Sequence, residues 1–266
     1  MTTVNEVYKF LNKLAPVEMK EDWDNVGFLI GCGDSKVTKI LVALDITSDV
    51  ISESIELDCQ LIVAHHPMFF SLKSVTDSDV TGKKIVKMLE NSMSGICMHT
   101  NLDAARGGIA DALAKAAGIS YNGDAELLTE DRRLETGEVY SMGRVGYLES
   151  PCNLQGYLEM LKQNVSTNGI RYYDAGREVY KIAVMGGSGG SMFSHAVRHG
   201  CDTYVSGDLK YDVFLEAKEL GINLIDADHF CTENLIVPII AEKLSAAFPH
   251  IQTMTSKALG QVVNFS

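Results

Sequence analysis

Hydrophobic and polar positions follow two alternating patterns along the first half of this chain. Short apolar runs of strand length alternate with segments whose apolar residues recur every three or four positions, as in amphipathic helices. The pattern predicts strands at residues 39–46, 60–66 and 95–100, and helices at 48–58, 82–93 and 108–118. Strands that alternate with helices are typical of a parallel sheet with crossover helices. A further amphipathic helix is expected near the N-terminus.

The same rhythm returns in the second half, after a less regular middle part at residues 122–180. Strands are predicted at 181–187, 202–208 and 223–229, with helices at 191–200 and 211–221 and a last helix through the 230s and 240s. Residues 39–67 align without gaps on 181–209, and most apolar positions coincide. His65–His66 falls on Gly207–Asp208 in this alignment. Chance similarity between two β-α-β units and an ancient duplication both explain the match, and either indicates two similar α/β units.

Composition narrows the class of protein. The 266 residues carry a formal net charge of −12, which argues against nucleic acid or an anionic membrane as the main partner, because phosphate binding needs clustered Lys and Arg. The six cysteines form no CxxC pair and mostly lie in apolar runs, as expected for reduced, buried thiols of a cytoplasmic protein. No apolar run is long enough for a transmembrane helix, and the N-terminal pattern does not resemble a signal peptide.

Candidate chemistry gathers where the predicted strands end. Ligands of open parallel sheets bind at the carboxyl ends of the strands. The polar residues at these ends are Asp45, His65, His66, His99, Asn101, Asp103, Asp208, Asp226, Asp228 and His229, and Glu233 follows one helical turn after His229. Imidazoles together with carboxylates suit zinc, iron, manganese or nickel.

The His65–His66–Pro67 sequence points to two metal ions rather than one. Two adjacent imidazoles at the end of a buried strand are costly without polar partners. At a strand end, where Pro67 fixes the turn, the two side chains can diverge toward different ions, which together activate a water. His99 is either a ligand or a residue that orients one, and we favour the second role. His195, His199 and His250 are interpreted as non-ligands.

The glycine-rich segment at residues 186–190 follows a strand and precedes a helix. It fits neither the GxGxxG nor the GxxxxGK[ST] phosphate-binding pattern. We therefore interpret it as a tight turn, or as backbone N–H groups that line a ligand cleft.

Four sequence blocks resemble the Nif-three-like family, also known as GTP cyclohydrolase I type 2. The blocks are WDNVGFLIG (23–31), LIVAHHPMFF (61–70), MHTNLDAARGGIADALA (98–114) and DADHFCTE (226–233). The resemblance spans nearly the whole chain in the same order. It implies two interlinked α/β domains with mostly parallel sheets and crossover helices: residues 1–125 plus 223–266 as the metal-binding domain, and 126–222 as the second domain.

The resemblance also implies a metal site and an assembly. Two divalent metal ions would be held by His65, His66, Asp103, His229 and Glu233, with Glu233 as the bridging ligand. The family usually has glycine where this chain has Asp228, so Asp228 could contact the metal or its water. Members commonly form a toroidal hexamer, so we expect a homohexamer. The helix that carries His229 and Glu233 is expected to pack on the first domain.

Two functions follow from these expectations. The first is a metal-dependent hydrolase, either opening a purine nucleotide ring in the manner of a GTP cyclohydrolase or acting as a nucleotide phosphoesterase, with Arg106 or Lys210 near the phosphates. The second is a metal-binding adaptor or metal-handling protein without turnover. Five protein ligands shared by two ions leave coordination positions open, which favours catalysis.

Overall fold

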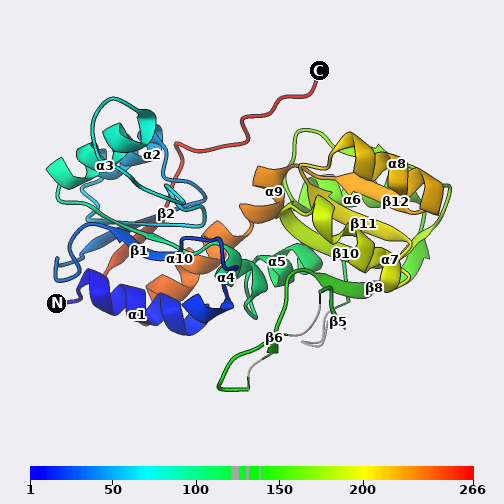
Figure 1. Ribbon diagram of the computed structural model, residues 1–266, viewed down its shortest axis with the longest axis horizontal. Helices are drawn as coiled ribbons and strands as arrows, with labels where there is room; N and C mark the ends of the chain where they lie inside the picture. The colour runs from blue at the N-terminus through cyan, green and yellow to red at the C-terminus, as the bar shows by residue number, and fades with distance from the viewer. Residues whose placement is uncertain (121–125, 130–131, 138) are drawn as a thin grey trace. The chain divides into compact units, whose positions relative to one another are not determined.

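The computed structural model describes residues 1–120, 126–129, 132–137 and 139–266, and it divides into two compact units (Figure 1). The first unit comprises Met1–Leu102 and Ile236–Gly260, and the second comprises Asp103–Leu235 and Gln261–Ser266. Each unit has its own β-sheet and its own hydrophobic core. No helix in the described part of the chain is long and apolar enough to cross a membrane.

The first unit is built on a five-stranded sheet in the order β1-β4-β3-β2-β13. Its strands are β1 (Gly27–Ile30), β2 (Lys39–Ala43), β3 (Leu61–Ala64), β4 (Ser94–Cys97) and β13 (Gln252–Thr255). All neighbouring strands are parallel except β1, which pairs antiparallel with β4. The three central strands are almost entirely buried because helices cover both faces, which explains their continuous apolar sequences.

The helices of the first unit present apolar stripes to this sheet. They are α1 (Val4–Leu14), the 3-10 helix η1 (Val17–Met19), α2 (Ser48–Glu56), α3 (Val80–Glu90) and α10 (Ile236–Ala247), and the short α4 (Thr100–Ala104) spans the boundary between the units. Helices α2 and α3 pack in the core that contains Leu41 and Ile62, while α10 packs beside Val42 and Val63, whose side chains point the other way.

The second unit is built on a six-stranded sheet in the order β5-β8-β10-β11-β12-β9. Its strands are β5 (Glu126–Leu127), β8 (Arg144–Cys152), β9 (Arg171–Tyr173), β10 (Val179–Ser188), β11 (Thr203–Gly207) and β12 (Asn223–Asp226), and a separate pair is formed by β6 (Arg132–Arg133) and β7 (Val139–Tyr140). Its helices are α5 (Ile109–Ala116), α6 (Leu154–Asn164), η2 (Gly190–Met192), α7 (Phe193–Arg198), α8 (Tyr211–Leu220) and α9 (His229–Glu233). Residues of α5, α6 and α9 share one core with β10, β11 and β12.

The predicted α/β class with two sheets and crossover helices is confirmed. Parallel pairing dominates the first sheet, but in the second it is restricted to the central strands β10, β11 and β12. Strands β5, β8 and β9, which come from the irregular middle part of the chain, pair antiparallel with their neighbours in the sheet.

The unit boundaries differ from those predicted from the sequence. Residues 103–120 and 223–235 belong to the second unit, because α5 packs on β10 and β8 and because β12 continues the second sheet. The predicted boundary at residue 125 lies outside the described residues. The predicted last helix is two helices. Helix α9, which carries His229 and Glu233, packs on β10 and β11, while α10 packs on β13 and β2. The expected packing of the His229 helix on the first domain stays a prediction.

The two aligned stretches of sequence have the same strand register. Ile40 pairs with Leu61 in the first sheet, and the aligned Ile182 pairs with Thr203 in the second. Both pairs are parallel and both are joined by a helix, α2 or α7. The two units therefore contain matching β-α-β elements, and aligned positions at their carboxyl ends can be compared directly.

Candidate metal centre

Strand β3 ends in a way that displays two imidazoles together. The backbone N–H groups of His65 and His66 both donate to the carbonyl oxygen of Leu44, at 3.1 and 2.9 Å. One acceptor shared by consecutive residues interrupts the regular parallel ladder, and Pro67 has no N–H to resume it. Both side chains can therefore turn toward the same end of the sheet.

His99 completes a group of three imidazoles in the first unit. The ring centroid of His65 lies 4.7 Å from that of His66 and 5.1 Å from that of His99, and the His66 and His99 centroids are 5.5 Å apart. One ring nitrogen of each lies within 4.8 Å of the others, close enough for one cation to contact all three. The sequence listed all three histidines at the strand ends and predicted that His65 and His66 diverge toward different ions, and the structure brings a ring nitrogen of each within reach of one cation.

Each of these imidazoles is held through its Nδ1 atom by an oxygen acceptor. Nδ1 of His65 lies 2.7 Å from the carbonyl oxygen of Met98, and Nδ1 of His66 and of His99 lies 2.8 Å from Asp45 and Asp24. A carbonyl or carboxylate oxygen can only accept, so Nδ1 is the protonated nitrogen and donates. In the neutral ring, Nε2 then carries the lone pair, which is the arrangement found in metal-binding histidines.

Asp24 is a functional residue that the strand-end argument missed. Its carboxylate is buried and accepts hydrogen bonds from His99 Nδ1 and from the backbone N–H and hydroxyl of Thr100. Burial by itself raises the pKa of Asp24, but these hydrogen bonds outweigh burial and lower the pKa to about 2. The available signal was the WDN sequence, which places an acid in a loop rather than after a strand.

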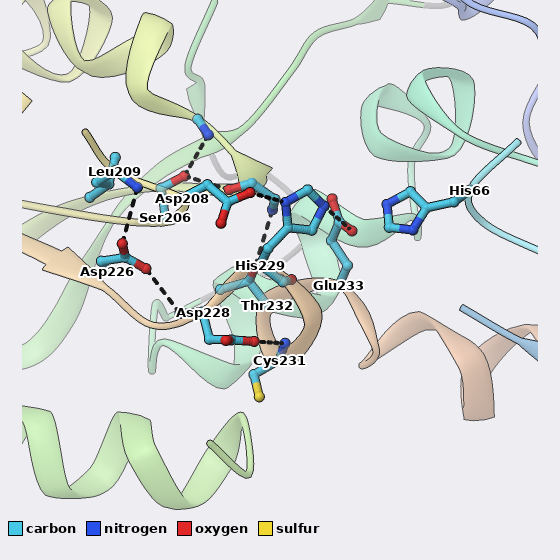
Figure 2. Close-up of polar contacts among 12 residues, drawn as sticks. His66, Ser206, Asp208, Leu209, Asp226, Asp228, His229, Cys231, Thr232 and Glu233 are labelled. Atoms are coloured by element: carbon cyan, nitrogen blue, oxygen red, sulfur yellow. Dashed lines mark hydrogen bonds and ion pairs between the residues drawn. The ribbon is translucent and has the colours of Figure 1, made fainter. Parts of the chain in front are cut away.

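The second unit holds a histidine between two carboxylates, shown in Figure 2. On α9, Nδ1 of His229 lies 2.7 Å from Asp208, and Nε2 lies 3.0 Å from Glu233, one helical turn further along. Burial by itself lowers the pKa of His229, but the hydrogen bonds and negative charges of Glu233 and Asp208 raise it to about 9. The sequence predicted the His229–Glu233 pair. Asp208, one of the polar residues predicted at the strand ends, accepts the hydrogen bond from Nδ1 of this ring.

The glycine-rich turn makes room for this pair. Gly187 has φ +62°, and a Cβ atom there would collide with Oε1 of Glu233 and lie 3.2 Å from Nε2 of His229. A Cβ atom at Gly207 would lie 2.7 Å from the Cα atom of His229. The backbone N–H of Gly187 donates to the hydroxyl of Thr232. Close backbone approach to α9 therefore explains glycine at these positions.

Asp228 has a structural role at the start of α9. Its φ is +72°, a left-handed conformation that glycine adopts most easily. The side chain of Asp228 accepts a hydrogen bond from the backbone N–H of Cys231 and so caps α9 (Figure 2). This cap offsets part of the backbone strain and assigns Asp228 to the start of the helix.

Asp103 lies on α4, four residues after His99, and its side chain is buried. The structure thus brings His65 and His66 together in the first unit and His229 and Glu233 together in the second. Joining these residues with Asp103 in one centre stays a prediction.

The other histidines are accounted for by other contacts. Both ring nitrogens of His199 lie 3.1 Å from oxygen atoms, of Glu126 and of the Leu128 backbone, and His250 bonds the hydroxyl of Thr2. In the described part of the chain, no group of metal-compatible side chains includes His195, His199 or His250. Their interpretation as non-ligands stays a prediction.

A cavity of about 500 Å³ lies beside Asp208 in the second unit. It is lined by the glycine-rich turn and by the start of α7 and α8, including Ser188, Ser191 and Lys210. Its size is in the usual range of small-molecule sites. The glycine-rich segment was interpreted as a tight turn or as the lining of a cleft. In the structure it is a turn that also lines this cavity.

Comparison with known proteins places this fold and this site in context. Residues 2–259 match the family model Duf34/NIF3 (NGG1p interacting factor 3). The chain is 34% identical over 248 residues to a GTP cyclohydrolase 1 type 2 homolog of Clostridium acetobutylicum, covering 92% of this chain and 90% of that protein. It is 31% identical to the GTP cyclohydrolase 1 type 2 of Helicobacter pylori, covering 92% of each.

A solved structure has the same fold. A Bacillus cereus protein related to NIF3 superimposes with a TM-score of 0.91 at 23% sequence identity, covering 100% of this chain and 99% of that one.

Proposed function

The chain belongs to the Duf34/NIF3 family, and from that premise we propose that it is a hydrolase with two divalent metal ions. The proposed ligands are His65, His66, Asp103, His229 and Glu233, with Glu233 shared by both ions. His99 is proposed to stand beside them and to orient or relay rather than to bind.

One observation carries this proposal: four histidines at the two groups have Nδ1 held by an oxygen acceptor. The partners are a backbone carbonyl for His65 and the carboxylates of Asp45, Asp24 and Asp208 for His66, His99 and His229. Histidines that bind metals through Nε2 are oriented in this way. His199 also has Nδ1 beside a carboxylate, but in the described part of the chain it belongs to no group of side chains that could hold a metal ion.

The chemistry of the donors supports joining the two groups. His229 and Glu233 supply two ligand side chains, fewer than the four that a divalent ion usually needs. The carboxylates that contact the imidazoles of the first unit, Asp45 and Asp24, accept hydrogen bonds from Nδ1 of His66 and His99. Imidazole and carboxylate donors without cysteine fit zinc, iron, manganese or nickel. On metal binding, His229 would release its Nε2 proton, because the lone pair of Nε2 must coordinate the ion.

Two bound divalent ions would supply Lewis acidity, which activates a water molecule and stabilises negative charge on the substrate. The chain's own residues orient the reaction. Asp24 holds Nδ1 of His99, so that His99 can accept or return a proton at Nε2. Glu233 is buried, which keeps its carboxylate out of water and available to cations.

A nucleotide is the substrate class that we propose, because the relatives are named for GTP. In the cyclohydrolase form of the reaction, the guanine ring opens at C8 and releases formate. The cavity beside Asp208 is large enough for part of a nucleotide, and Lys210 lines it. The overall charge of −12 means that cations and backbone N–H groups must balance most of the phosphate charge. We also propose the homohexamer expected from the family resemblance.

An assay for product tests the function. Protein loaded with each of the four metals is incubated with GTP and with a panel of nucleotide phosphoesters, and formate and phosphate are measured. We expect one product from wild type and none from Glu233→Gln. His195→Ala serves as a matched control, because His195 lies in the same unit but outside the proposed ligand set.

The family model is named for an interacting factor, so a metal-binding adaptor is the second candidate. Full metal occupancy combined with no product from any substrate would favour the adaptor and contradict the hydrolase.

A further inference from the structure

Two large aromatic side chains of the first unit stand in solvent beside the three imidazoles. Trp23 is 62% exposed and Phe70 is 56% exposed. Their ring centroids are 5.6 Å apart, and they lie 5.9 and 6.0 Å from the ring of His99. Aromatic residues of this size that only stabilise a fold are usually well buried. This pair therefore needs another explanation.

The backbone on either side of Trp23 is fixed by hydrogen bonds. Asp24 holds His99 and Thr100, and the ammonium group of Lys20 donates to the Asp24 carbonyl at 2.8 Å. The amide of Asn25 donates to the carbonyl of Phe69 at 2.8 Å, which ties the Trp23 loop to the Phe70 loop. The WDN sequence thus presents one ring, orients one imidazole and anchors the second aromatic loop.

Phe69 and Phe70, which are adjacent in this loop, have different environments. Phe69 is half-buried and packs against the core of the first unit, whereas Phe70 points into solvent next to Trp23. Phe69 therefore anchors the loop, and Phe70 is displayed. Prearranged rings bind with little loss of conformational entropy, because few bonds must be ordered on binding.

We propose that Trp23 and Phe70 form a stacking platform for the planar heteroaromatic ring of the substrate. Flat aromatic rings stack on indole and phenyl groups whatever their hydrogen-bond pattern, because every such ring has a π-face. The platform borders His99 and, through it, His65 and His66, so a stacked ring would lie next to the imidazole group. This inference rests on the proposed function and narrows it to substrates with a ring, which excludes simple phosphoesters.

The chain provides its own probe, because Trp23 is its one tryptophan. Intrinsic fluorescence therefore reports on the platform directly and does not depend on turnover. Metal-loaded protein is titrated with guanosine and, as a match without the ring, with ribose 5-phosphate. We expect saturable quenching by guanosine and none by ribose 5-phosphate.

Variants at Phe70 identify the second ring. Phe70→Leu should weaken guanosine binding at least fivefold, and Phe70→Tyr, which keeps an aromatic face, should bind within twofold of wild type. Tyr211→Leu is the control, because Tyr211 is 77% exposed on the second unit and should leave the titration unchanged.

Three results would overturn the platform. The first is equal quenching by guanosine and ribose 5-phosphate, or quenching by neither. The second is unchanged guanosine binding by Phe70→Leu, and the third is unchanged binding together with a changed sedimentation coefficient of Phe70→Leu, which would assign the pair to contacts between copies. Quenching without any turnover would contradict the hydrolase and leave the platform standing. Turnover of GTP with an unchanged KM in Phe70→Leu would support the hydrolase and contradict the platform.

Discussion

The matching β-α-β elements of the two units end in opposite ways. In the first unit, Asp45 follows β2 and His66 follows β3, and their side chains bond each other. The aligned positions of the second unit are Gly187 and Asp208. Gly187 has no side chain, and Asp208 accepts a hydrogen bond from His229, which arrives on α9 (Figure 2).

The difference shows two ways to place an imidazole at the end of a parallel sheet. In the first unit, His65 and His66 directly follow the end of β3 and are adjacent in the sequence. The second unit leaves space at the strand ends, with Gly187 and Gly207, and fills it with a short helix. The second arrangement depends on the missing side chains, because a Cβ atom at Gly187 or Gly207 would collide with α9.

The largest effect is expected from removing one imidazole of either unit. His66→Ala and His229→Ala should each lose at least one metal equivalent per chain, because each variant lacks one of the proposed metal ligands. Elemental analysis of the purified protein measures this loss. His195→Ala should keep its full metal content. Full occupancy in His66→Ala or His229→Ala would break the idea that both units contribute to one centre.

Filling the space in the second unit comes next. Gly187→Ala adds a methyl group against Glu233 at a positive φ, so we expect a loss of about 2 kcal/mol in the free energy of unfolding, together with weaker metal binding. Gly176→Ala is the matched control, because Gly176 has φ +72° and open space around it. It should cost only about 1 kcal/mol, from backbone strain alone. Equal losses of unfolding free energy in Gly187→Ala and Gly176→Ala, measured by urea unfolding, would show that α9 is not in close contact with the turn.

The buried acid of the first unit should appear in the acid stability of the protein. The pKa of Asp24 is lowered from its ordinary value of 3.8 to about 2, so its ionised form stabilises the folded chain at neutral pH. About 2 kcal/mol should be present above pH 4 and lost as the pH falls from 4 toward 2. Asp24→Asn should lose this part of the pH dependence in urea unfolding at several pH values. An unchanged slope would mean that Asp24 is not held as the structure indicates.

The smallest effect is expected from the acids that orient the two imidazoles. Asp45→Asn and Asp208→Asn should each weaken metal binding about tenfold, measured by competition with a chelator, since the acceptor for Nδ1 is weakened while the ligand stays. Asp49→Asn, an exposed acid at the start of α2, controls for the lost charge. A tenfold effect in one variant and none in the other would show that the imidazoles of the two units are not equivalent.

Most of the fold could be predicted from the sequence, because apolar spacing depends on local geometry. The strands at residues 39–43 and 61–64 and the helix between them lie where the pattern predicted them. The antiparallel edges of the second sheet could not be predicted, since pairing partners such as β9 and β12 lie about fifty residues apart. The sheet on which α9 packs could not be predicted either, since its apolar spacing is the same whichever sheet it contacts.

The candidate site divides in the same way. The sequence by itself determined which side chains are available at the strand ends, because parallel strands bring their carboxyl ends to one edge. Only the tertiary structure decided which acid holds each imidazole. Asp24 lies 75 positions before His99, and Gly187 is small because of a residue on α9. Such choices follow from packing and hydrogen bonding in three dimensions, and no local spacing records them.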